Sequence, residues 1–596
     1  MAQDNGNSAQ GATPIASIAT SWRRRLAEPA RLDLLRYLAL TLTPMTLLAI
    51  GFKVQKVFRA ATTTQSRLEA SLICATSDVV AGAAFAIVLG VILHVSRGRV
   101  RAGASLVLQA MTLVGMCYLV IEHSFFVVTG TRLDWQLLVF SMSHAAQINR
   151  IVASEITLLR GLLLLAMMAI ALVPWLWRPR SATAKSVSWK RVSKPLWIAG
   201  LSIAIVAFGF MKRPLPSNLQ PLRSSSLISP MVEATWWLLA PDGASATGPV
   251  HPVEPLVVVK TDKTRPFNVV ILTLESVRAQ SLTVYDNSLK TTPKLAEIAK
   301  LGTTYETAYT IIPHTSKSLI PIHCGIYPKL THHFDEAADG NLPTTCLAEI
   351  LNRLGWSTHF IQNPESVFER RRDLVKAFGF SKLTADEQLP KGAYKKVGYF
   401  GYEDKVLIKP TLDWIDEHQL AHPDQPFFLG MLNVTTHHPY HVPAGFPKKN
   451  WTDNKRLNKY LDALAYLDEF LDELFAGFKK RGLLDNTIFV MMGDHGEGFG
   501  EHGLYQHDET IYEEGLRVPL IVIGPDVPKG QRASGLRQHI DIMPTILDQL
   551  GLRVAAGSLP GRSLVSSEGH EQIFFSCWKR KSCHGFRKGD IKYIHY

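Results

Sequence analysis

The sequence predicts two parts: an α-helical transmembrane region, then an α/β domain built on a mostly parallel, doubly wound sheet. Five apolar stretches lie before residue 214, and each approaches the roughly 17–25 residues needed to span a bilayer core. From Pro266 onward, short apolar runs typical of strands alternate with helical runs, which is the pattern of a parallel sheet covered by helices. The apolar stretches are Leu34–Phe52, Leu72–Val95, Ala104–Val128, Gly161–Trp177 and Pro195–Met211.

These patterns predict four consecutive regions of the chain. Residues 1–30 begin with small and polar residues, and we expect a disordered cytoplasmic tail there. A five-helix transmembrane domain is expected over 31–213. Residues 214–262 are rich in Pro, Ser and Gly and predict a linker, and residues 263–596 form the α/β domain.

Basic residues between the apolar stretches predict the orientation. Clusters at Arg23–Arg25, Arg97–Arg101 and Arg178–Lys194 fall on one side of the membrane if five helices cross it, and that side is expected to be cytoplasmic. An odd number of crossings then places 263–596 outside the cytoplasm. The segment Lys53–Arg67 carries four basic residues on the opposite side and departs from this rule.

The charge balance by itself could suggest a nucleic-acid partner. Lys and Arg number 64 against 51 Asp and Glu, a net charge of +13. Many of these basic residues flank apolar segments, however, and zinc-finger spacing and Arg-rich helices with interleaved aromatics are missing from the sequence. We therefore expect a membrane partner and no nucleic acid.

Three ionisable residues lie within or near the ends of the predicted spans: Asp78, Glu122 and His123. Charged groups are costly inside a membrane, so such residues are functional candidates. The alternative is an interfacial position or a hydrogen bond between helices.

Six cysteines divide into two groups. Cys74 and Cys117 fall in apolar stretches and are expected to be inert, whereas the other four lie in the α/β domain. Two disulfides can form there in an oxidising compartment, with the pairing left open by the sequence.

The predicted strands and helices of the α/β domain follow one another along the chain. The strands are FNVVILTL, WSTHFIQ, FFLGMLNV, NTIFVMMG and VPLIVIG. The helical runs include KTTPKLAEIAKLG, a charged helix after WSTHFIQ, a long helix over 455–480 and IDIMPTILDQLG.

Carboxylates and imidazoles follow three of these strands. In doubly wound sheets, ligands bind beyond the carboxyl ends of the strands, so these side chains are expected at one edge. Oxygen and nitrogen ligands of this kind suit Zn²⁺ or Mn²⁺. The alternative is a set of unrelated capping groups. The residues are Glu275 after the first strand, His437 and His438 after the third, and Asp494, His495, Glu501, His502 and His507 after the fourth.

The stretch PHTSKSLIPIHCGIYP at residues 313–328 carries a candidate nucleophile. A Thr hydroxyl is a poor nucleophile at neutral pH, but coordination to a divalent cation activates it. Thr315 would serve if it joins Glu275, Asp494 and His495 around one ion. The alternative is a helix N-cap at Thr315 or Ser316.

These motifs resemble the alkaline phosphatase/sulfatase superfamily, and within it the membrane-anchored lipoteichoic acid synthases and lipid A phosphoethanolamine transferases. DHGEGFGEHGLYQH is close to the transferase pattern D-H-G-E-S-L-G-E-x-G-x-Y-x-H, HHPY matches an H-x-P-F/Y element, and Thr315 stands ten residues before the Gly of GIYP. The resemblance implies a sulfatase-like fold with Glu275, Thr315, Asp494 and His495 as the metal ligands. It also implies that His437 and His507 bind substrate, with a second-metal role as the alternative for His507.

The chain departs from the superfamily in two places. Lys317 and Leu319 replace the Pro and Arg of the sulfatase motif, so conversion of the nucleophile to formylglycine is not expected. In VFERRRDLVKAFGF, Glu369 stands where lipoteichoic acid synthases have Trp, whereas Arg371 matches their Arg. Arg371 is a candidate phosphate ligand, with a solvated helix face as the alternative.

The expected function is metal-dependent transfer of a phospho-head group, phosphoethanolamine or phosphoglycerol, through a phosphothreonine at Thr315. The donor would be a membrane phospholipid, the acceptor a cell-envelope glycan or lipid, and the cofactor a divalent metal, Zn²⁺ rather than Mn²⁺ because imidazoles are present. The resemblance implies a multi-pass protein of the bacterial inner membrane with a periplasmic or extracellular catalytic domain.

Two other functions fit the same residues. A membrane-anchored sulfatase or phosphodiesterase would use water as its acceptor. A membrane sensor or assembly factor with an inactive domain is the third hypothesis, and the presence of all four expected ligands disfavours it.

Overall fold

A computed structural model describes most of the chain. It covers residues 34–60, 64–96, 98–143, 157–176, 222–239 and 255–595, except 331–333, 566–567 and 579–582, together with isolated positions between 149 and 219. The chain divides into two compact units, Met1–Ser143 with Val152–Ser245, and His144–Ile151 with Ala246–Tyr596. The predicted tail 1–30 and nearly all of the predicted span Pro195–Met211 lie outside the described residues.

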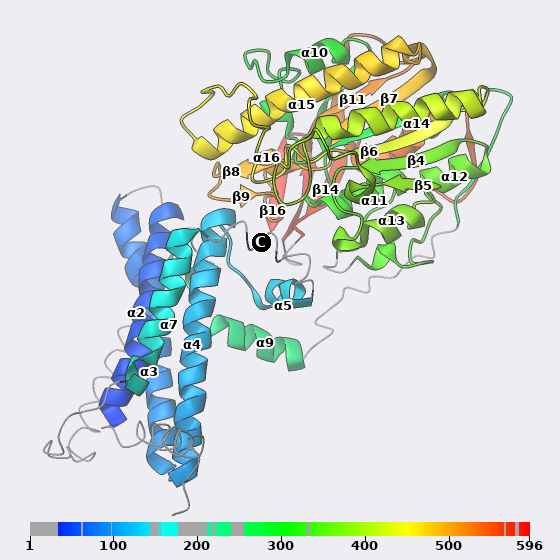
Figure 1. Ribbon diagram of the computed structural model, residues 1–596. Coiled ribbons are helices and arrows are strands. Elements are labelled where there is room, and N and C mark those ends of the chain that lie inside the picture. The colour runs from blue at the N-terminus through cyan, green and yellow to red at the C-terminus, as the bar shows by residue number, and fades with distance from the viewer. Residues whose placement is uncertain are drawn as a thin grey trace, which may run out of the picture. The chain divides into compact units, whose positions relative to one another are not determined.

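The first unit is a bundle of apolar helices (Figure 1). Within the described residues, three helices are long and apolar enough to cross a membrane, in agreement with the first three predicted spans. The predicted span Gly161–Trp177 corresponds to α7, whose apolar stretch Arg160–Pro174 is shorter. The helices are α2 (Leu34–Ala60), α3 (Thr64–Val95), α4 (Gly98–Thr129), α5 (Trp135–Ser143), α7 (Leu158–Leu176) and α9 (Ser229–Leu239).

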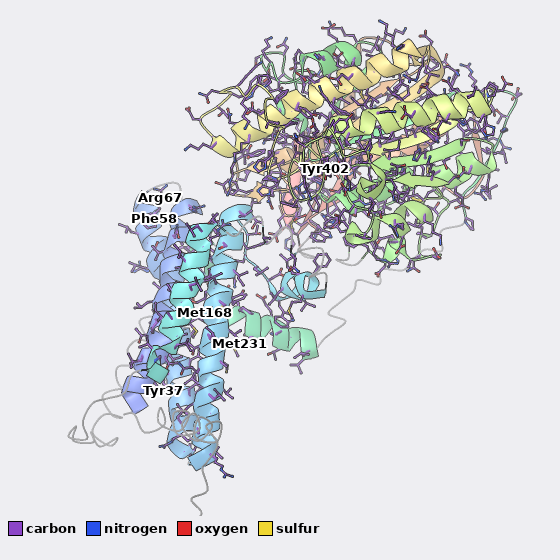
Figure 2. All side chains as sticks on the ribbon, viewed as in Figure 1. Tyr37, Phe58, Arg67, Met168, Met231 and Tyr402 are labelled. Carbon is purple, nitrogen blue, oxygen red and sulfur yellow. A yellow bond between two sulfur atoms is a disulfide. The ribbon has the colours of Figure 1, made fainter. Side chains whose placement is uncertain are left out.

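Polar contacts join the helices of this bundle. The Tyr37 hydroxyl on α2 lies 3.0 Å from the Ser105 carbonyl oxygen and 3.0 Å from Gln109 Oε1, both on α4. Near the other end of α2, the Arg67 guanidinium lies 6.0 Å from the centroid of the Phe58 ring (Figure 2). These contacts fix α2 against both of its neighbours.

Two buried ion pairs account for part of the charge at Lys53–Arg67. Lys53 Nζ on α2 lies 2.5 Å from Asp78 Oδ2 on α3, and Lys56 forms an ion pair with Glu122 of α4. Both lysines are about 1 % exposed, so they face the bundle interior instead of a loop. The positive-inside rule counts loop charges, and these two residues therefore do not count against the predicted orientation.

The second unit is built around a mixed, mostly parallel sheet, as predicted. The strand order is β10-β3-β11-β7-β2-β6-β4-β5, and β12 pairs with β3. The run from β7 to β5 is parallel throughout, whereas β11 pairs antiparallel with both β7 and β3. The strands are β2 (Asn268–Leu274), β3 (Thr303–Tyr309), β4 (Ser357–Gln362), β5 (Lys382–Thr384), β6 (Phe427–Leu432), β7 (Thr487–Gly493), β10 (Arg517–Val518), β11 (Leu520–Ile523) and β12 (Gln531–Gln538).

Helices pack against this sheet, with the long α14 and α15 lying over the same face (Figure 1). The predicted helix 455–480 coincides with α15, whose N-cap Asn454 accepts from the amides of Arg456 and Leu457. The helices are α10 (Pro293–Ala299), α11 (Thr315–Cys324), α12 (Leu347–Arg353), α13 (Arg371–Ala377), α14 (Ile408–Ala421), α15 (Lys455–Lys480), α16 (Glu513–Leu516) and α17 (Ile542–Gln549).

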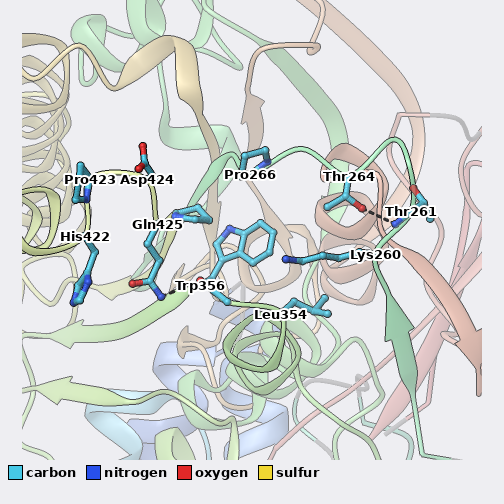
Figure 3. A pocket seen from close by; sticks show the side chains of 12 residues that line it. Lys260, Thr261, Thr264, Pro266, Leu354, Trp356, His422, Pro423, Asp424 and Gln425 are labelled. Atoms are coloured by element: carbon cyan, nitrogen blue, oxygen red, sulfur yellow. Dashed lines mark hydrogen bonds between the residues drawn. The ribbon is translucent and has the colours of Figure 1, made fainter.

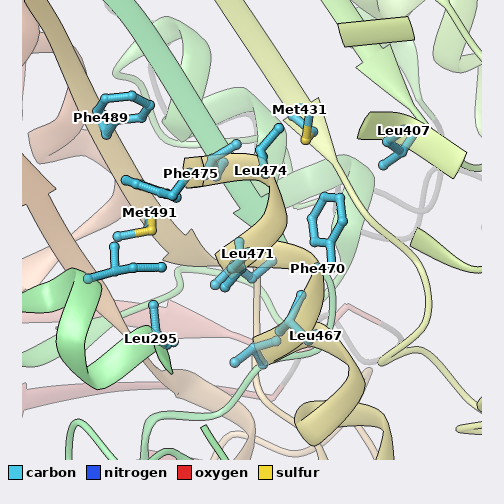
Figure 4. Packing of buried hydrophobic residues seen from close by; sticks show 14 of the residues in the cluster. Leu295, Leu407, Met431, Leu467, Phe470, Leu471, Leu474, Phe475, Phe489 and Met491 are labelled. Carbon is cyan, nitrogen blue, oxygen red and sulfur yellow. The ribbon is translucent and has the colours of Figure 1, made fainter. Parts of the chain in front are cut away.

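The core of the second unit lies between α15 and the central strands. Leu467, Leu471 and Leu474 recur at helical spacing on one face of α15 and are fully buried. They pack with Phe489 and Met491 of β7 (Figure 4). Each buried Leu contributes about 1.5–3 kcal/mol, so this face holds α15 to the central strands.

Shorter strands and two disulfides complete the second unit. Disulfides join Cys324 to Cys346 and Cys577 to Cys583, which settles the pairing that the sequence left open. Cys74 and Cys117 are free thiols. The remaining strands are β1 (Val257–Val259) paired with β13 (Arg553–Ala556), β8 (Gly498–Phe499) paired with β9 (Tyr505–Gln506), and the sheet of β14 (Gln572–Ser576), β15 (His584–Lys588) and β16 (Ile591–His595).

Candidate metal centre

The carboxyl ends of two parallel strands bring three predicted ligands together. Leu274 ends β2 and pairs with Gly493, which ends β7, so the residues that follow are neighbours. Those residues are Glu275 after β2, and Asp494 and His495 after β7. One atom from each of the three lies within 4.8 Å of the others.

Thr315 lies beside this group at the first residue of α11. Its Oγ1 is 3.2 Å from Glu275 Oε2 and 3.3 Å from His495 Nε2. His495 Nε2 is in turn 3.3 Å from Asp494 Oδ2. All four side chains are buried, so the structure brings the four predicted ligands to one place.

Hydrogen bonds orient these side chains toward a common centre. Asp494 Oδ1 accepts from the amides of Ser276 and His495, whereas Oδ2 is buried without a hydrogen-bond partner in the described part of the chain. His495 Nδ1 donates to the Gly496 carbonyl at 2.9 Å, which leaves Nε2 as a lone-pair donor. Two carboxylates, an imidazole nitrogen and a hydroxyl fit a divalent cation.

Gly496 explains part of the D-H-G-E motif. A Cβ at this position would lie 2.0 Å from the Glu514 carbonyl oxygen. The amide of Gly496 bonds to the Gly515 carbonyl, and the amide of Glu497 to that of Glu514. A side chain at Gly496 would therefore push the loop carrying the candidate ligands out of place.

Burial shifts the pKa values of this cluster away from the charged forms. It raises the pKa of Asp494 to about 7 and that of Glu497 to about 8, and it lowers the pKa of His495 to about 3. A charged group buried without a compensating charge is costly. A bound cation would offset that cost at Asp494.

Arg371 faces the same centre from α13. It is 3 % exposed, and its Nη2 donates to Ser316 Oγ at 2.9 Å. Its Nε and Nη1 are buried without hydrogen-bond partners in the described residues. Arg370 instead pairs with Asp373 at the surface, and Arg372 is exposed too, so Arg371 is the one inward arginine of the three at 370–372.

His437 and His507 lie beside the candidate ligands. The His507 ring stacks on His495 with 4.0 Å between centroids, and its centroid is 5.9 Å from that of His437. His437 Nδ1 donates to the His438 carbonyl. His438 itself lies against Tyr399 and Tyr440.

The sequence pattern did not single out several residues near this centre. His314 stacks on Trp578 with 3.9 Å between centroids, and its Nε2 lies 3.3 Å from Glu369 Oε1. Asp508 Oδ1 lies 3.3 Å from His314 Nδ1, and Glu497 Oε1 lies 3.3 Å from His507 Nδ1. Adjacency to Thr315 or to His507 was the signal available for His314 and Asp508.

A separate hollow lies at the amino ends of the same parallel strands. It has a volume of about 710 Å³ and is lined by residues that precede β2, β4 and β6, with Lys260 over the Trp356 ring at 5.6 Å (Figure 3). Because the carboxylate cluster is at the carboxyl ends, this hollow is not part of the candidate centre.

Comparison with known proteins assigns the central part of the second unit. The family model described as Sulfatase matches residues 267–552. These residues form a sulfatase-family domain. The match covers the whole central sheet and all four candidate ligands.

Individual relatives of the sulfatase-family domain are distant. Lipoteichoic acid synthase 2 of Bacillus subtilis is 26 % identical over 238 residues, which are 38 % of this chain and 35 % of that protein. A sulfatase of Formosa agariphila is 22 % identical over 400 residues, 55 % of this chain and 78 % of that protein. The alignment thus spans about a third of the length of the lipoteichoic acid synthase.

Two solved structures are also similar. A protein in the alkaline phosphatase superfamily from Vibrio parahaemolyticus is 21 % identical, with a TM-score of 0.48 over 58 % of this chain and 81 % of that one. The lipoteichoic acid synthase LtaP from Listeria monocytogenes is 18 % identical, with a TM-score of 0.46 over 56 % of this chain and 86 % of that one.

Proposed function

We propose that the protein transfers a phosphoethanolamine or phosphoglycerol head group from a membrane phospholipid to a hydroxyl of a cell-envelope glycan or lipid. The observation that carries this proposal is the position of Thr315 Oγ1, within 3.4 Å of Glu275 and His495 at the start of α11. Apolar helices in the same chain favour a substrate that resides in the membrane. The lipoteichoic acid synthase relatives favour a phosphorylated head group.

Glu275, Thr315, Asp494 and His495 would hold one divalent cation. When bound, Zn²⁺ or Mn²⁺ favours ionisation of the Thr315 hydroxyl and offsets negative charge on a phosphate oxygen. His495 favours Zn²⁺, because imidazole suits that ion.

In the first half-reaction, a bond forms between Thr315 Oγ1 and phosphorus, and the bond from phosphorus to the diacylglycerol oxygen breaks. Glu275 Oε2, at 3.2 Å, accepts the Thr315 proton. Diacylglycerol leaves with a proton donated by the imidazolium form of His437, whereas His507, whose pKa burial lowers to about 4, is neutral and binds substrate. The open Nε and Nη1 of Arg371 bind a phosphate oxygen.

In the second half-reaction, the acceptor hydroxyl attacks the phosphothreonine. The bond from phosphorus to Thr315 Oγ1 breaks, and the head group passes to the acceptor oxygen. The imidazole that protonated diacylglycerol takes the acceptor proton, and Thr315 regains its own from Glu275. Both the nucleophile and the two proton carriers are thereby restored.

A second candidate function is hydrolysis of a sulfate or phosphate ester by the same residues. The match to the Sulfatase family favours it. Water would then replace the acceptor hydroxyl in the second half-reaction. Phospholipid with a labelled head group separates the two: transfer labels a cell-envelope acceptor, whereas hydrolysis releases only the water-soluble head group.

The same proposal includes a location and domain limits. We place a cytoplasmic tail at 1–30, five transmembrane helices within 31–213, a linker over 214–262 and an extracytoplasmic catalytic domain at 263–596, in a bacterial inner membrane. The two disulfides favour an oxidising compartment for the catalytic domain. Protease accessibility of 263–596 in inverted and right-side-out vesicles tests this orientation.

Substitution of Thr315 tests the mechanism. The full chain in vesicles of labelled phospholipid should yield a peptide containing Thr315 with the mass of the transferred head group. Thr315→Ala should abolish both the adduct and turnover while metal remains bound, and Thr315→Ser should retain part of the turnover because a hydroxyl is kept. Full activity in Thr315→Ala would rule out the phosphothreonine scheme.

A further inference from the structure

The small sheet near the end of the chain has an inner face that packs on the domain. β14, β15 and β16 form this antiparallel sheet, coloured red in Figure 1, and all three strands lie beyond the residues that match the Sulfatase family. Successive side chains of a strand point to opposite faces. On the inner face, Ile573 and Phe575 are buried in one core cluster with Tyr309. An outer face of polar side chains is the usual complement of such a buried face.

The outer face of this sheet carries aromatic side chains instead. Phe574, Phe586 and Tyr593 stand opposite one another across the three strands. The rings of Phe586 and Tyr593 stack with 5.5 Å between centroids. Phe574 is 53 % exposed, Tyr593 is 50 % exposed, and Ile591 on the same face of β16 is 72 % exposed. Contiguous exposed apolar side chains of this kind mark an interaction site.

The polar side chains on the outer face are not acidic. The three strands contribute Lys588, His584 and His595 to it, and neither Asp nor Glu. Lys588 Nζ lies 2.6 Å from Glu571, which precedes β14. Neutral and basic groups therefore surround the aromatic row within the sheet itself.

The segment that contains the sheet has an excess of positive charge. Residues 571–596 include six Lys and Arg against two acidic residues, Glu571 and Asp590. Glu513, from outside the segment, pairs with two of the six basic residues. Six positive charges against three carboxylates still leave the segment basic, which favours an anionic partner.

We propose that Phe574, Phe586, Ile591 and Tyr593 dock the sulfatase-family domain on an anionic phospholipid surface. Aromatic side chains favour the boundary between membrane and water, and anionic lipids attract basic segments near that boundary. The same chain carries helices that are long and apolar enough to cross a membrane. Docking is therefore intramolecular, and a weak contact suffices because the effective concentration of the surface is high.

The docking face is connected to the candidate metal centre. β14 continues to Trp578, whose ring stacks on that of His314 with 3.9 Å between centroids. The Trp578 amide donates to the Asp508 carbonyl at 2.9 Å. His314 precedes Thr315, so a docked sheet would hold the nucleophile at a set distance from the lipid. This consequence for turnover rests on the proposed function, whereas the docking itself does not.

A glycan and a second copy of the chain are the competing occupants of this face. Aromatic rings also stack on sugars, but a neutral glycan would make no use of Ile591 or of the positive charge. A symmetric contact with a second copy would place the patch against itself and bring Lys588 toward the same basic face. Neither occupant would put lipid in contact with the sheet.

Labelling by a photoreactive lipid tests the proposal in the full chain. The protein is reconstituted in phosphatidylcholine vesicles with or without phosphatidylglycerol, each with a trace of phospholipid that carries a diazirine near its head group. Mass spectrometry after illumination should find lipid adducts on β14 and β16 in the vesicles that contain phosphatidylglycerol, and fewer as salt is raised. Adducts on α2, α3 and α4 are the internal control. Labelled helices with an unlabelled sheet would overturn the proposal.

Substitutions on the outer face separate docking from random collision with lipid. The double variant Phe574→Ser with Tyr593→Ser should reduce the adducts on the sheet about tenfold or more, because two apolar contacts with lipid are lost. The matched control is Leu420→Ser at the end of α14, where Leu420 is 88 % exposed, and it should leave the adducts unchanged. Equal labelling of the sheet in the double variant and in wild type would contradict the docking face.

A charge variant tests the anionic partner. Lys588→Glu should reduce the adducts on the sheet in vesicles with phosphatidylglycerol and not in phosphatidylcholine alone, because it places an acidic group on the outer face. Thermal unfolding shows whether each variant is folded. If the double variant does not fold, Lys588→Glu and the comparison of the two lipid compositions decide the result.

The outcome is separable from that of the proposed function. Thr315→Ala should give the same lipid adducts on the sheet as wild type, because Thr315 lies outside the docking face. A labelled sheet in a protein that forms no phosphothreonine would support the docking face and remove the transferase scheme. An unlabelled sheet in a protein that forms the phosphothreonine would do the reverse.

Discussion

Buried charges occur in both units of the protein: among the described residues, two buried lysines of the helical bundle each meet a carboxylate, whereas at one sheet edge of the second unit two carboxylates lie beside each other. In the helical bundle, Lys53 meets Asp78 and Lys56 meets Glu122, each within hydrogen-bond distance. At the sheet edge of the sulfatase-family domain, carboxylates and imidazoles converge on one another instead.

Each of the two bundle carboxylates has a lysine as its counter-charge, and the Lys53–Asp78 pair has further polar contacts. Lys53 also donates to Ser77 Oγ and to the Ser224 carbonyl, and Asp78 accepts from Ser225 and Ser226. Such pairs need no ligand, and they fasten residues 224–226 to α2 and α3. This difference teaches that a buried charge close to its counter-charge indicates a contact that stabilises the fold. An excess of buried charges of one sign instead indicates a ligand-binding site. The contacts of Asp78 and Glu122 fit the alternative that these residues join one helix to another. The third candidate, His123, stacks on Phe52.

Removal of metal should give the largest effect and should act on one unit only. Chelation should lower turnover about a thousandfold or more, because a metal ion supplies several kcal/mol of transition-state stabilisation. Added Zn²⁺ or Mn²⁺ should restore it. Hydrogen exchange in α2, α3 and α4 should stay unchanged, and turnover that survives chelation would contradict the assignment of the carboxylate cluster.

A carboxylate-to-amide change in the bundle should destabilise the protein. Asp78→Asn leaves Lys53 buried without its counter-charge, and breaking a buried pair costs about 3–5 kcal/mol. The double variant Lys53→Met with Asp78→Asn should recover most of that loss. Chemical unfolding of the bundle measures both, and equal stability of Asp78→Asn and wild type would show that the pair is not a structural tie.

The same chemical change at the sheet edge should have the opposite sign. Burial raises the pKa of Asp494 from 3.8 to about 7, so in metal-free protein the unfolded state ionises first and stability falls as pH rises from about 4 to about 7. Asp494→Asn removes this loss and should raise the free energy of unfolding by roughly 4 kcal/mol at pH 8, and by less than about 1 kcal/mol at pH 4. The variant should also lose zinc.

Unfolding of the stripped sulfatase-family domain, followed at β2 and β7 by hydrogen exchange, measures the Asp494 effect. If the Asp494→Asn variant is less stable than the wild type at pH 8, the ionised Asp494 carboxylate is stabilised by the protein without a bound metal ion.

His323 is a third kind of buried ionisable group, because it lies away from the carboxylate cluster and has no ion pair among the described residues. Its nitrogens have no hydrogen-bond partners in the described residues, and Phe360, Phe378, Phe380 and Phe428 surround its ring. Burial lowers its pKa from 6.5 to about 3. Below pH 6.5 the imidazole of the unfolded state therefore binds a proton, whereas that of the native state does not. The free energy of unfolding falls as the pH drops below 6.5.

His323→Phe should remove this acid sensitivity, and the gain relative to wild type should grow by about 2 kcal/mol between pH 8 and pH 5. Urea unfolding at the two pH values measures it. A gain that does not change with pH would show that the native imidazole takes up the proton.

The sequence by itself determined the elements that depend on local patterns. The apolar stretches of α2, α3 and α4 and the amphipathic face of α15 follow from periodicity, and the strand runs at β2, β4, β6, β7 and β11 follow from short apolar segments. Glu275, Asp494 and His495 could be expected together, because the ends of neighbouring parallel strands meet at one edge.

Only the tertiary structure decided which distant residues meet. The antiparallel position of β11 between β7 and β3 is set by long-range pairing that no local pattern records. Lys53 and Asp78 meet because two helices pack side by side, and Glu369 reaches His314 across a separation of 55 residues because α13 folds back toward α11. Charges interact through space and not along the sequence. The ion pairs of the bundle and the group of carboxylates at the sheet edge could therefore be identified only in the folded chain.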